Sequence, residues 1–192
     1  MTTTSVSRSS GERISDLAVI VVAAVALMAG AWLKSSVEAR ATTFSSGEIA
    51  AQVPAGWLRA TSARGEVLRV SHPASSGFAT TYVIETEPVT REATAEGIVG
   101  LLSLRRAQQW TAYRVLDQQP VTVDGRDAYR VSFVYVESDP NLTRADLPSV
   151  VRGEDYVFIQ GVRAIVVSYR ADSDGYDVEH ERFEQFLISV KF

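Results

Sequence analysis

The most pronounced hydrophobic pattern is one uncharged run, Leu17–Leu33, which reads "LAVIVVAAVALMAGAWL". As an α-helix these residues would be about 25 Å long, against a hydrocarbon core of about 30 Å, so the run is just long enough to span a bilayer. Trp32 and Lys34 close it in the manner of an interfacial anchor, because an indole prefers the headgroup level and a lysine can extend outward. The pattern predicts a transmembrane anchor, bounded by Leu17 and Leu33 and fixed at its end by Trp32 and Lys34.

The same run has a second interpretation, a cleaved secretory signal peptide. Arg8 and Arg13 precede it, and Ala29–Ala31 has the small-x-small form of a cleavage site. Its apolar length exceeds the usual signal core, which favours retention. Basic residues flank both ends and nearly cancel the positive-inside signal. The order of short tail, single span and large domain is typical of a signal anchor, so we expect the domain outside the cytoplasm, at the cell membrane.

The hydrophobic and polar pattern divides the chain into four parts. We predict a cytoplasmic tail over 1–16, a transmembrane helix over 17–33, a tether over 34–46 and one domain over 47–192. The tether residues are small, polar and mixed in charge. The remaining length, about 150 residues, is a common size for one domain with one core.

Strand-like patterns recur through the domain, with β-branched and aromatic residues enriched between turn formers. Asp124-Gly125 predicts a tight hairpin turn, because both positions tolerate positive φ. The nearly continuous apolar stretch "AIVVSY", from Ala164, predicts a strand buried on both faces in the middle of a sheet. The expected strands are 48–53, 66–73, 78–89, the two arms of a hairpin over 113–138, 150–160 and 162–171.

Two segments have helical spacing instead. The first is Ala93–Gln109, and the second follows Asp177, a candidate helix cap. The second helix places five apolar residues on one stripe: Tyr176, Phe183, Phe186, Leu187 and Val190. Strands with two apolar faces need a covering layer on each side. The pattern therefore predicts an α+β fold, a three-layer α/β/α domain with a central, mainly antiparallel sheet.

Composition excludes several kinds of chemistry. The chain has no cysteine, which excludes disulfides, thiolate-held iron–sulfur clusters, cysteine nucleophiles and covalent haem attachment. From Ala41 onward the chain has 15 basic and 20 acidic residues, which argues against a nucleic-acid partner, because such binding depends on clustered cations.

Candidate catalytic and metal-binding residues are few. His72 and His180 are each isolated in the sequence, and we interpret them as structural or solvated residues. The acidic stretch Asp172–Glu181 suggests a calcium loop, but its spacing fails: Tyr176 and Phe183 stand where an EF-hand has ligands. No serine lies in a nucleophile elbow. We predict no catalytic, cofactor-binding or metal-binding residues, and no enzymatic activity.

The order of these motifs resembles the PsbP-like family, which includes the extrinsic subunit of photosystem II. The resemblance covers about Phe44 to Phe192 and rests on Pro54-Ala55-Gly56-Trp57, the Val123-Asp124-Gly125 turn, the hairpin "GEDYVFIQGVRAIVVSYRA" and the terminal "FEQFLISVKF". It implies an antiparallel sheet between layers of helices, and a role in binding proteins or stabilising complexes. The amino-terminal span departs from the mature photosystem subunit, so we expect a membrane-anchored bacterial relative.

Three functional hypotheses follow. The first is a non-catalytic interaction module, an accessory or stabilising subunit of a membrane complex, whose partners are the lipid bilayer and integral membrane protein subunits. Its candidate partner loop is 138–149, with Pro140, Asn141, Arg144 and Leu147. The second is an ectodomain that binds a lipid or other apolar molecule in a pocket of several hundred Å³ lined by residues such as Trp57, Trp110 and Phe186. The third is a hydrolase, which would need a cleft joining a histidine to a carboxylate and a serine.

Overall fold

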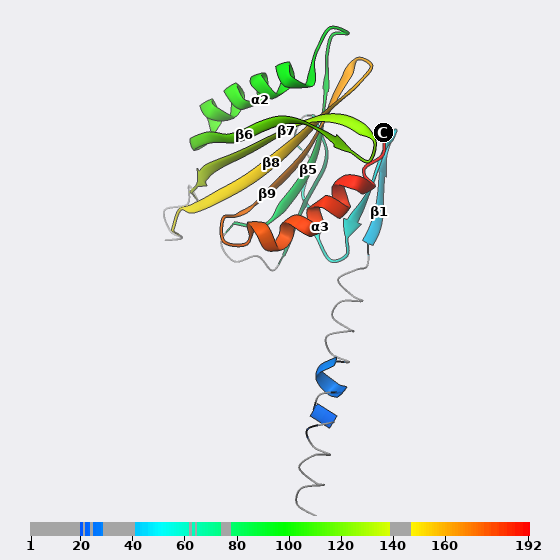
Figure 1. Ribbon diagram of the computed structural model, residues 1–192, viewed down its shortest axis with the longest axis vertical. Helices are drawn as coiled ribbons and strands as arrows, with labels where there is room; N and C mark the ends of the chain where they lie inside the picture. The colour runs from blue at the N-terminus through cyan, green and yellow to red at the C-terminus, as the bar shows by residue number, and fades with distance from the viewer. Residues whose placement is uncertain are drawn as a thin grey trace, which may run out of the picture. The chain divides into compact units, whose positions relative to one another are not determined.

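The computed structural model describes residues 20, 22–23, 25–28, 41–61, 63, 65–73, 78–138 and 147–192. The chain divides into two compact units, Met1–Ala41 and Thr42–Phe192. Residues 20, 22–23 and 25–28 of the first unit are helical (Figure 1). None of the helices in the described ranges has the length and apolar character that a membrane span requires. The predicted anchor residues Leu17, Trp32, Leu33 and Lys34 lie outside the described residues.

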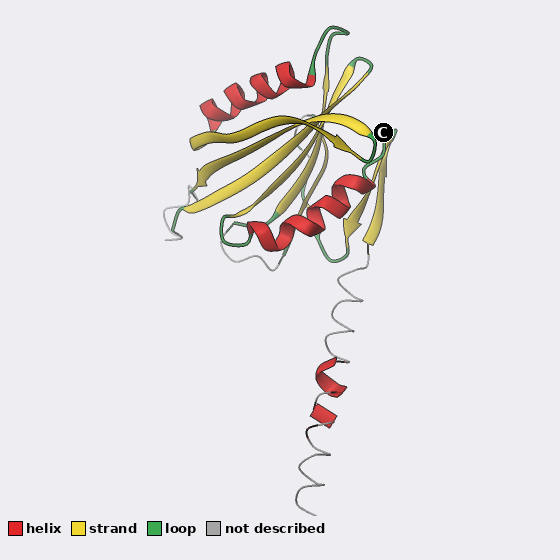
Figure 2. Cartoon of the chain, viewed as in Figure 1, coloured by secondary structure: helices red, strands yellow, loops and turns green. Residues whose placement is uncertain are grey.

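The second unit is built on an antiparallel sheet of seven strands, in the order β3-β4-β5-β9-β8-β7-β6. Figure 2 shows the strands in yellow and the helices in red. A separate two-stranded sheet pairs β1 with β2. The strands are β1 Ala41–Ser46, β2 Ile49–Pro54, β3 Leu58–Arg59, β4 Glu66–Ser71, β5 Thr81–Pro88, β6 Thr111–Val123, β7 Arg126–Glu137, β8 Ser149–Gln160 and β9 Arg163–Asp172.

One helix covers each face of the large sheet (Figure 1). Helix α2, Ala95–Gln109, packs on β6, β7 and β8, and buries Ile98, Val99 and Leu102 against Val157 and Val166 among others. Thr94 caps its first turn by accepting the Gly97 N–H at 3.1 Å. Helix α3, Tyr176–Ser189, packs on β9 and β2 over the opposite face, where the larger core lies.

The main elements of the predicted domain are confirmed. The sheet is central and antiparallel, and β9, whose residues 164–171 are all buried, is its middle strand. Asp124 and Gly125 both have positive φ, 48° and 73°, at the β6–β7 turn. The predicted apolar stripe on the terminal helix is buried against the sheet.

Two local predictions differ from the structure. Ala41–Ser46, the last six residues of the predicted tether, form strand β1, which pairs with β2 and buries Phe44 in the larger core. Asp177 is not the cap of α3: the cap position is Gly175, which makes no side-chain hydrogen bond, and Asp177 lies in the first turn. An acidic residue there still complements the helix dipole.

The predicted partner loop lies mainly outside the described residues. Pro140, Asn141 and Arg144 are not among them, and Leu147, at the described end of the segment, is 88% exposed.

Gly153 in β8 supports a first testable prediction. A Cβ at this position would lie 2.5 Å from Phe133 Cζ and 2.7 Å from the Tyr169 carbonyl oxygen. Because neither the packed ring nor the sheet backbone can yield easily, Gly153→Ala should lower the free energy of unfolding by about 1–3 kcal/mol in urea denaturation. The matched control is Gly100→Ala in α2, where nothing lies within 4 Å. It should stabilise the protein by up to about 1 kcal/mol; equal effects of the two variants would contradict this packing account.

Candidate functional site

Strand β8 carries two neighbouring buried carboxylates, Glu154 and Asp155. Their residues are 5% and 0% exposed. Consecutive residues of a strand point to opposite faces, so Glu154 faces α3 and Asp155 faces α2. A buried carboxylate is costly unless it is paired or hydrogen-bonded. Each face of the sheet therefore has to supply partners for one of them.

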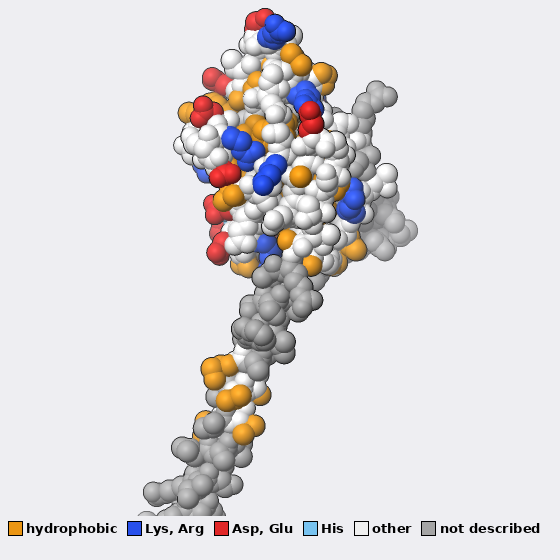
Figure 3. All heavy atoms as spheres, turned by 90° about the vertical axis from the view of Figure 1, so that its right-hand side faces the viewer, with side chains coloured by type: hydrophobic (Ala, Val, Ile, Leu, Met, Phe, Trp, Pro, Cys, Tyr) orange, Lys and Arg blue, Asp and Glu red, His pale blue; other side chains and the backbone are white. Residues whose placement is uncertain are grey.

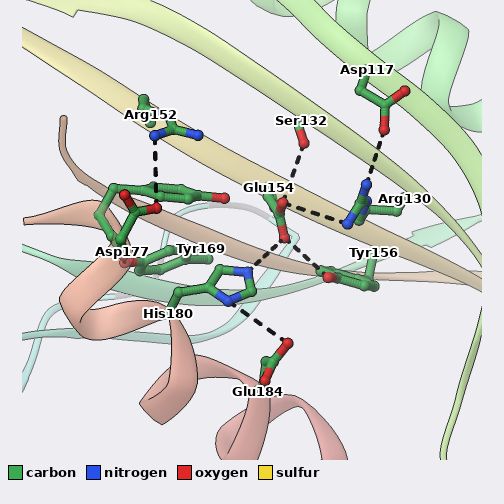
Figure 4. A network of polar contacts seen from close by, with 11 residues as sticks. Asp117, Arg130, Ser132, Arg152, Glu154, Tyr156, Tyr169, Asp177, His180 and Glu184 are labelled. Atoms are coloured by element: carbon green, nitrogen blue, oxygen red, sulfur yellow. Dashed lines mark hydrogen bonds and ion pairs between the residues drawn. The ribbon is translucent and has the colours of Figure 1, made fainter.

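On the α3 face, Glu154 is the centre of a polar network (Figure 4). It accepts hydrogen bonds from the Tyr156 hydroxyl at 3.0 Å and the Ser132 hydroxyl at 3.2 Å, and His180 Nε2 lies 3.2 Å away. Arg130 Nη1 is 3.9 Å from the same carboxylate. Burial alone would raise the pKa of Glu154, but hydrogen bonds from His180, Tyr176 and Tyr156 outweigh it and hold the pKa below its ordinary value.

The outer members of the network extend it to the surface. Arg130 Nη2 donates to Asp117 at 2.9 Å, and His180 Nδ1 is 3.7 Å from Glu184 (Figure 4). The imidazole packs edge-on to the Tyr169 ring at 5.9 Å between ring centroids. Both sides of His180 are thus occupied by carboxylates from its own helix and from β8.

The chemistry available to this network is limited. A serine, a histidine and a carboxylate do meet here, but the Ser132 hydroxyl donates to Glu154 rather than to His180. A hydrolytic triad needs the base to contact the nucleophile and the carboxylate to orient the base. Here the Glu154 carboxylate accepts from Ser132 and from His180, so the geometry is that of a stabilised buried charge.

On the α2 face, Asp155 forms an ion pair with Arg106 from the last turn of α2. The Ser168 hydroxyl donates to Asp155 Oδ1 at 2.7 Å. The Arg106 guanidinium also lies 4.8 Å from the ring centroids of Trp110 and Phe133. Arg106 therefore attaches the carboxyl-terminal end of α2 to the sheet through both a charge and two aromatic faces.

Two surface pockets lie on different faces of the domain. One, of about 340 Å³, is lined by Phe44, Trp57 and Arg59 among others. The other, of about 360 Å³, is lined by Arg69, Trp110, Tyr135 and Arg170 among others. Burial lowers the pKa of Arg170, but a guanidinium is not deprotonated at neutral pH, so the residue stays charged.

The three residues predicted to line one apolar pocket are not brought together. Trp57 packs on Tyr82 in the core beneath α3, with ring centroids 4.3 Å apart, and Phe186 is buried in the same core. Trp110 packs on Phe133 and Tyr135 on the other face of the sheet. The sheet separates Trp110 from the other two, so the single pocket between sheet and helix was a wrong prediction.

The two histidines and the acidic stretch have local explanations. The His72 ring packs on Trp57 at 5.4 Å between centroids, while His180 belongs to the Glu154 network. In the acidic stretch, Asp172 accepts the Asp174 N–H at 3.1 Å, which closes a turn before α3. Among the described residues, no group of three or more His, Cys, Asp or Glu side chains is placed to hold a metal ion.

Sequence reasoning missed Glu154, Asp155, Arg106 and Arg170 as members of a site. The signal was present, because charged residues interrupt two strands that the apolar pattern otherwise predicts to be buried. A buried charge requires a partner. The sequence alone does not identify that partner, since Arg106 and Asp155 are 49 positions apart (155 − 106) and meet only through the packing of α2 on β8.

Comparison with known proteins shows the fold. No family model and no curated protein sequence matches the chain. Among solved structures, cyanobacterial PsbP (CyanoP) from Synechocystis sp. PCC 6803 is similar over 79% of this chain and 92% of its own, at 12% identity and a TM-score of 0.57. LpqN of Mycobacterium tuberculosis, involved in cell envelope biogenesis, is similar over 79% and 90%, at 15% identity and a TM-score of 0.54.

A eukaryotic protein has a similar structure as well. The Ran-binding protein Mog1p of Saccharomyces cerevisiae matches 79% of this chain and 94% of its own, at 10% identity and a TM-score of 0.50. None of the three names describes an enzymatic activity. The chain has a PsbP-like fold, as the motif order predicted.

The lowered pKa of Glu154 gives a testable pH dependence. A carboxyl group whose pKa is lower in the folded protein stabilises the fold above its ordinary value of 4.5, and this stabilisation is lost as the pH falls below 4.5 through the folded value. Glu154→Gln should therefore be less stable than the parent chain near neutral pH and should lose less of its free energy of unfolding below about pH 4.5. Urea denaturation at a series of pH values measures both effects.

The control for that experiment is Glu181→Gln, which removes one exposed carboxylate from α3, the helix that carries His180. It should follow the parent profile. If the free energy of unfolding of Glu154→Gln fell below pH 4.5 as steeply as that of the parent chain, the assigned role of the Glu154 network would be contradicted.

Proposed function

We propose that the chain is a membrane-anchored, non-catalytic interaction module that serves as an accessory or stabilising subunit of a membrane protein complex. The PsbP-like domain would lie outside the cytoplasm and act by binding. The uncharged run Leu17–Leu33 would attach it to the bilayer.

The observation that carries the non-catalytic part is how the polar groups inside the domain are used. The Glu154 carboxylate is 7% exposed and accepts from Ser132 and Tyr156, and Asp155 is fully buried against Arg106 and Ser168. Groups that satisfy one another in this way stabilise a fold, whereas a reaction centre leaves a base or nucleophile directed at substrate.

The likeness of fold supports an associating role by analogy. One similar structure is a Ran-binding protein, and another is involved in cell envelope biogenesis. The second of these also favours an envelope location. Figure 3 shows a face of the domain on which acidic and basic side chains are interspersed, and such a surface favours a protein partner over a nucleic acid.

The candidate partner surface is the segment 138–149 between β7 and β8. Its described end carries Leu147, 88% exposed, followed by Val150, 47% exposed. Large apolar side chains exposed close together are a feature of interaction sites. We therefore place the first contact with the partner at Leu147.

The anchor is tested by membrane fractionation of cells that express the full chain. We expect the chain in the membrane pellet after an alkaline carbonate wash, because an inserted helix resists extraction whereas a peripheral protein does not. A variant that lacks residues 1–40 should appear in the soluble fraction. Release of the full chain by carbonate would contradict the anchor.

The partner surface is tested by site-specific photo-crosslinking in intact cells. A photoreactive residue in place of Leu147 should give a discrete adduct of higher mass, because an exposed side chain at an interface lies within reach of the partner. The matched control replaces Leu58, an apolar residue that is 59% exposed on the edge strand β3. Adducts of equal yield at both positions, or at Leu58 alone, would contradict the assignment of the loop.

A further inference from the structure

The sheet face that α2 covers continues beyond the end of that helix. Helix α2 packs on β6, β7 and β8 and ends at Gln109, so the parts of β4, β5 and β9 on the same face lie past it. Across these strands Ser71 is opposite Thr81, Thr81 is opposite Arg170, and Arg170 is opposite Gly153. Residues directly opposite one another in an antiparallel sheet share a face. This row forms the floor of the 360 Å³ pocket, which Ser71, Thr81 and Arg170 line.

Arg170 is the unusual member of the row. The residue is 8% exposed, and its guanidinium lies 4.7 Å from the ring centroid of Trp110, the capping residue just after α2. Its Nε is buried without a hydrogen-bond partner. Within the described parts of the chain, no carboxylate lies within ion-pair distance of Arg170. Glu85 and Glu66 attract Arg170 only from beyond ion-pair distance, so this buried cation lacks the direct pairing that offsets its desolvation, and an anion bound in the pocket would supply it.

The neighbouring arginines differ from Arg170 in this respect. Arg69, also on the pocket wall, is held by two hydrogen bonds to Glu66, one of them 3.0 Å from Nε. Arg106 is paired with Asp155 and lies against Trp110, at 4.8 Å from its ring centroid. Arg170 therefore has other cations close by and is the guanidinium of this group with no carboxylate against it.

We propose that the pocket over Arg170 binds a small organic monocarboxylate with a flat apolar body. A guanidinium matches a planar carboxylate through parallel N–H donors. The rings of Trp110 and Tyr135, stacked with centroids 4.4 Å apart, and that of Phe78 give the walls an aromatic surface for the apolar body. The volume is within the range of small-molecule sites.

Two acidic residues restrict the ligand to a single negative charge. Glu137 lies on the wall of the pocket, and Glu85 attracts Arg170 electrostatically from the neighbouring strand β5. A dianionic phosphate would be repelled by both more strongly than a monocarboxylate. Glu137 also provides a means of tuning the site without disturbing its buried part, since its side chain is exposed.

The test is isothermal titration calorimetry of the full chain, in a mild non-ionic detergent, with benzoate and with benzamide. The two probes have nearly the same shape, and benzoate alone is charged. We expect saturable benzoate binding with a dissociation constant of about 0.1–10 mM, the range for a ligand of this size, and at least about tenfold weaker binding of benzamide. Inorganic phosphate should bind more weakly than benzoate.

Variants locate the binding. Arg170→Gln should weaken benzoate binding at least about tenfold, while Arg59→Gln, which changes an arginine of the other pocket, should leave it unchanged. Glu137→Gln should tighten it, because a repelling charge is removed, and this variant keeps the parent fold even where Arg170→Gln does not. The proposal is overturned by equal binding of benzoate and benzamide, by the absence of benzoate binding at 50 mM, or by parent-like affinity in a folded Arg170→Gln protein.

Discussion

The rest of the domain depends on the burial of two adjacent carboxylates in the middle of β8. Glu154 and Asp155 point to opposite faces of the same strand, so neither face can be closed by apolar residues alone. Helix α2 brings Arg106 to one and helix α3 brings His180 to the other. Because a buried charge whose partner is lost costs several kcal/mol, these pairs select one position for each helix on the sheet.

This arrangement bears directly on what the domain can do. Most of the buried charged groups pair with one another and hold the helices in position on the sheet. The charged groups that remain available for binding lie on the surface and in the pocket beyond the end of α2. Arg170 is the exception among the buried charges on that face, since Trp110 covers it and no carboxylate pairs with it within the described chain. Under the two proposals above, the protein partner would contact the domain at Leu147 and the carboxylate ligand would bind over Arg170, so the two would use different parts of the surface.

The sequence predicted the elements of the fold far better than the site. Periodicity was sufficient for β9 and the terminal helix because their burial follows from local apolar patterns, and Asp124-Gly125 located the hairpin turn. Ala41–Ser46 was assigned to the tether because its strand depends on pairing with β2, which no local pattern reveals. The Arg106–Asp155 pair and the Glu154 network could not be predicted, since they arise from packing between segments distant in sequence.

The central claim is that the chain functions as a stable member of a membrane protein complex. The most direct measurement is extraction of native membranes in a mild detergent, followed by a native gel and mass spectrometry of the proteins that migrate with this chain. The account predicts comigration, in stoichiometric amounts, with an integral membrane complex. Migration of the chain alone, at the mass of a monomer or a homodimer, would contradict it.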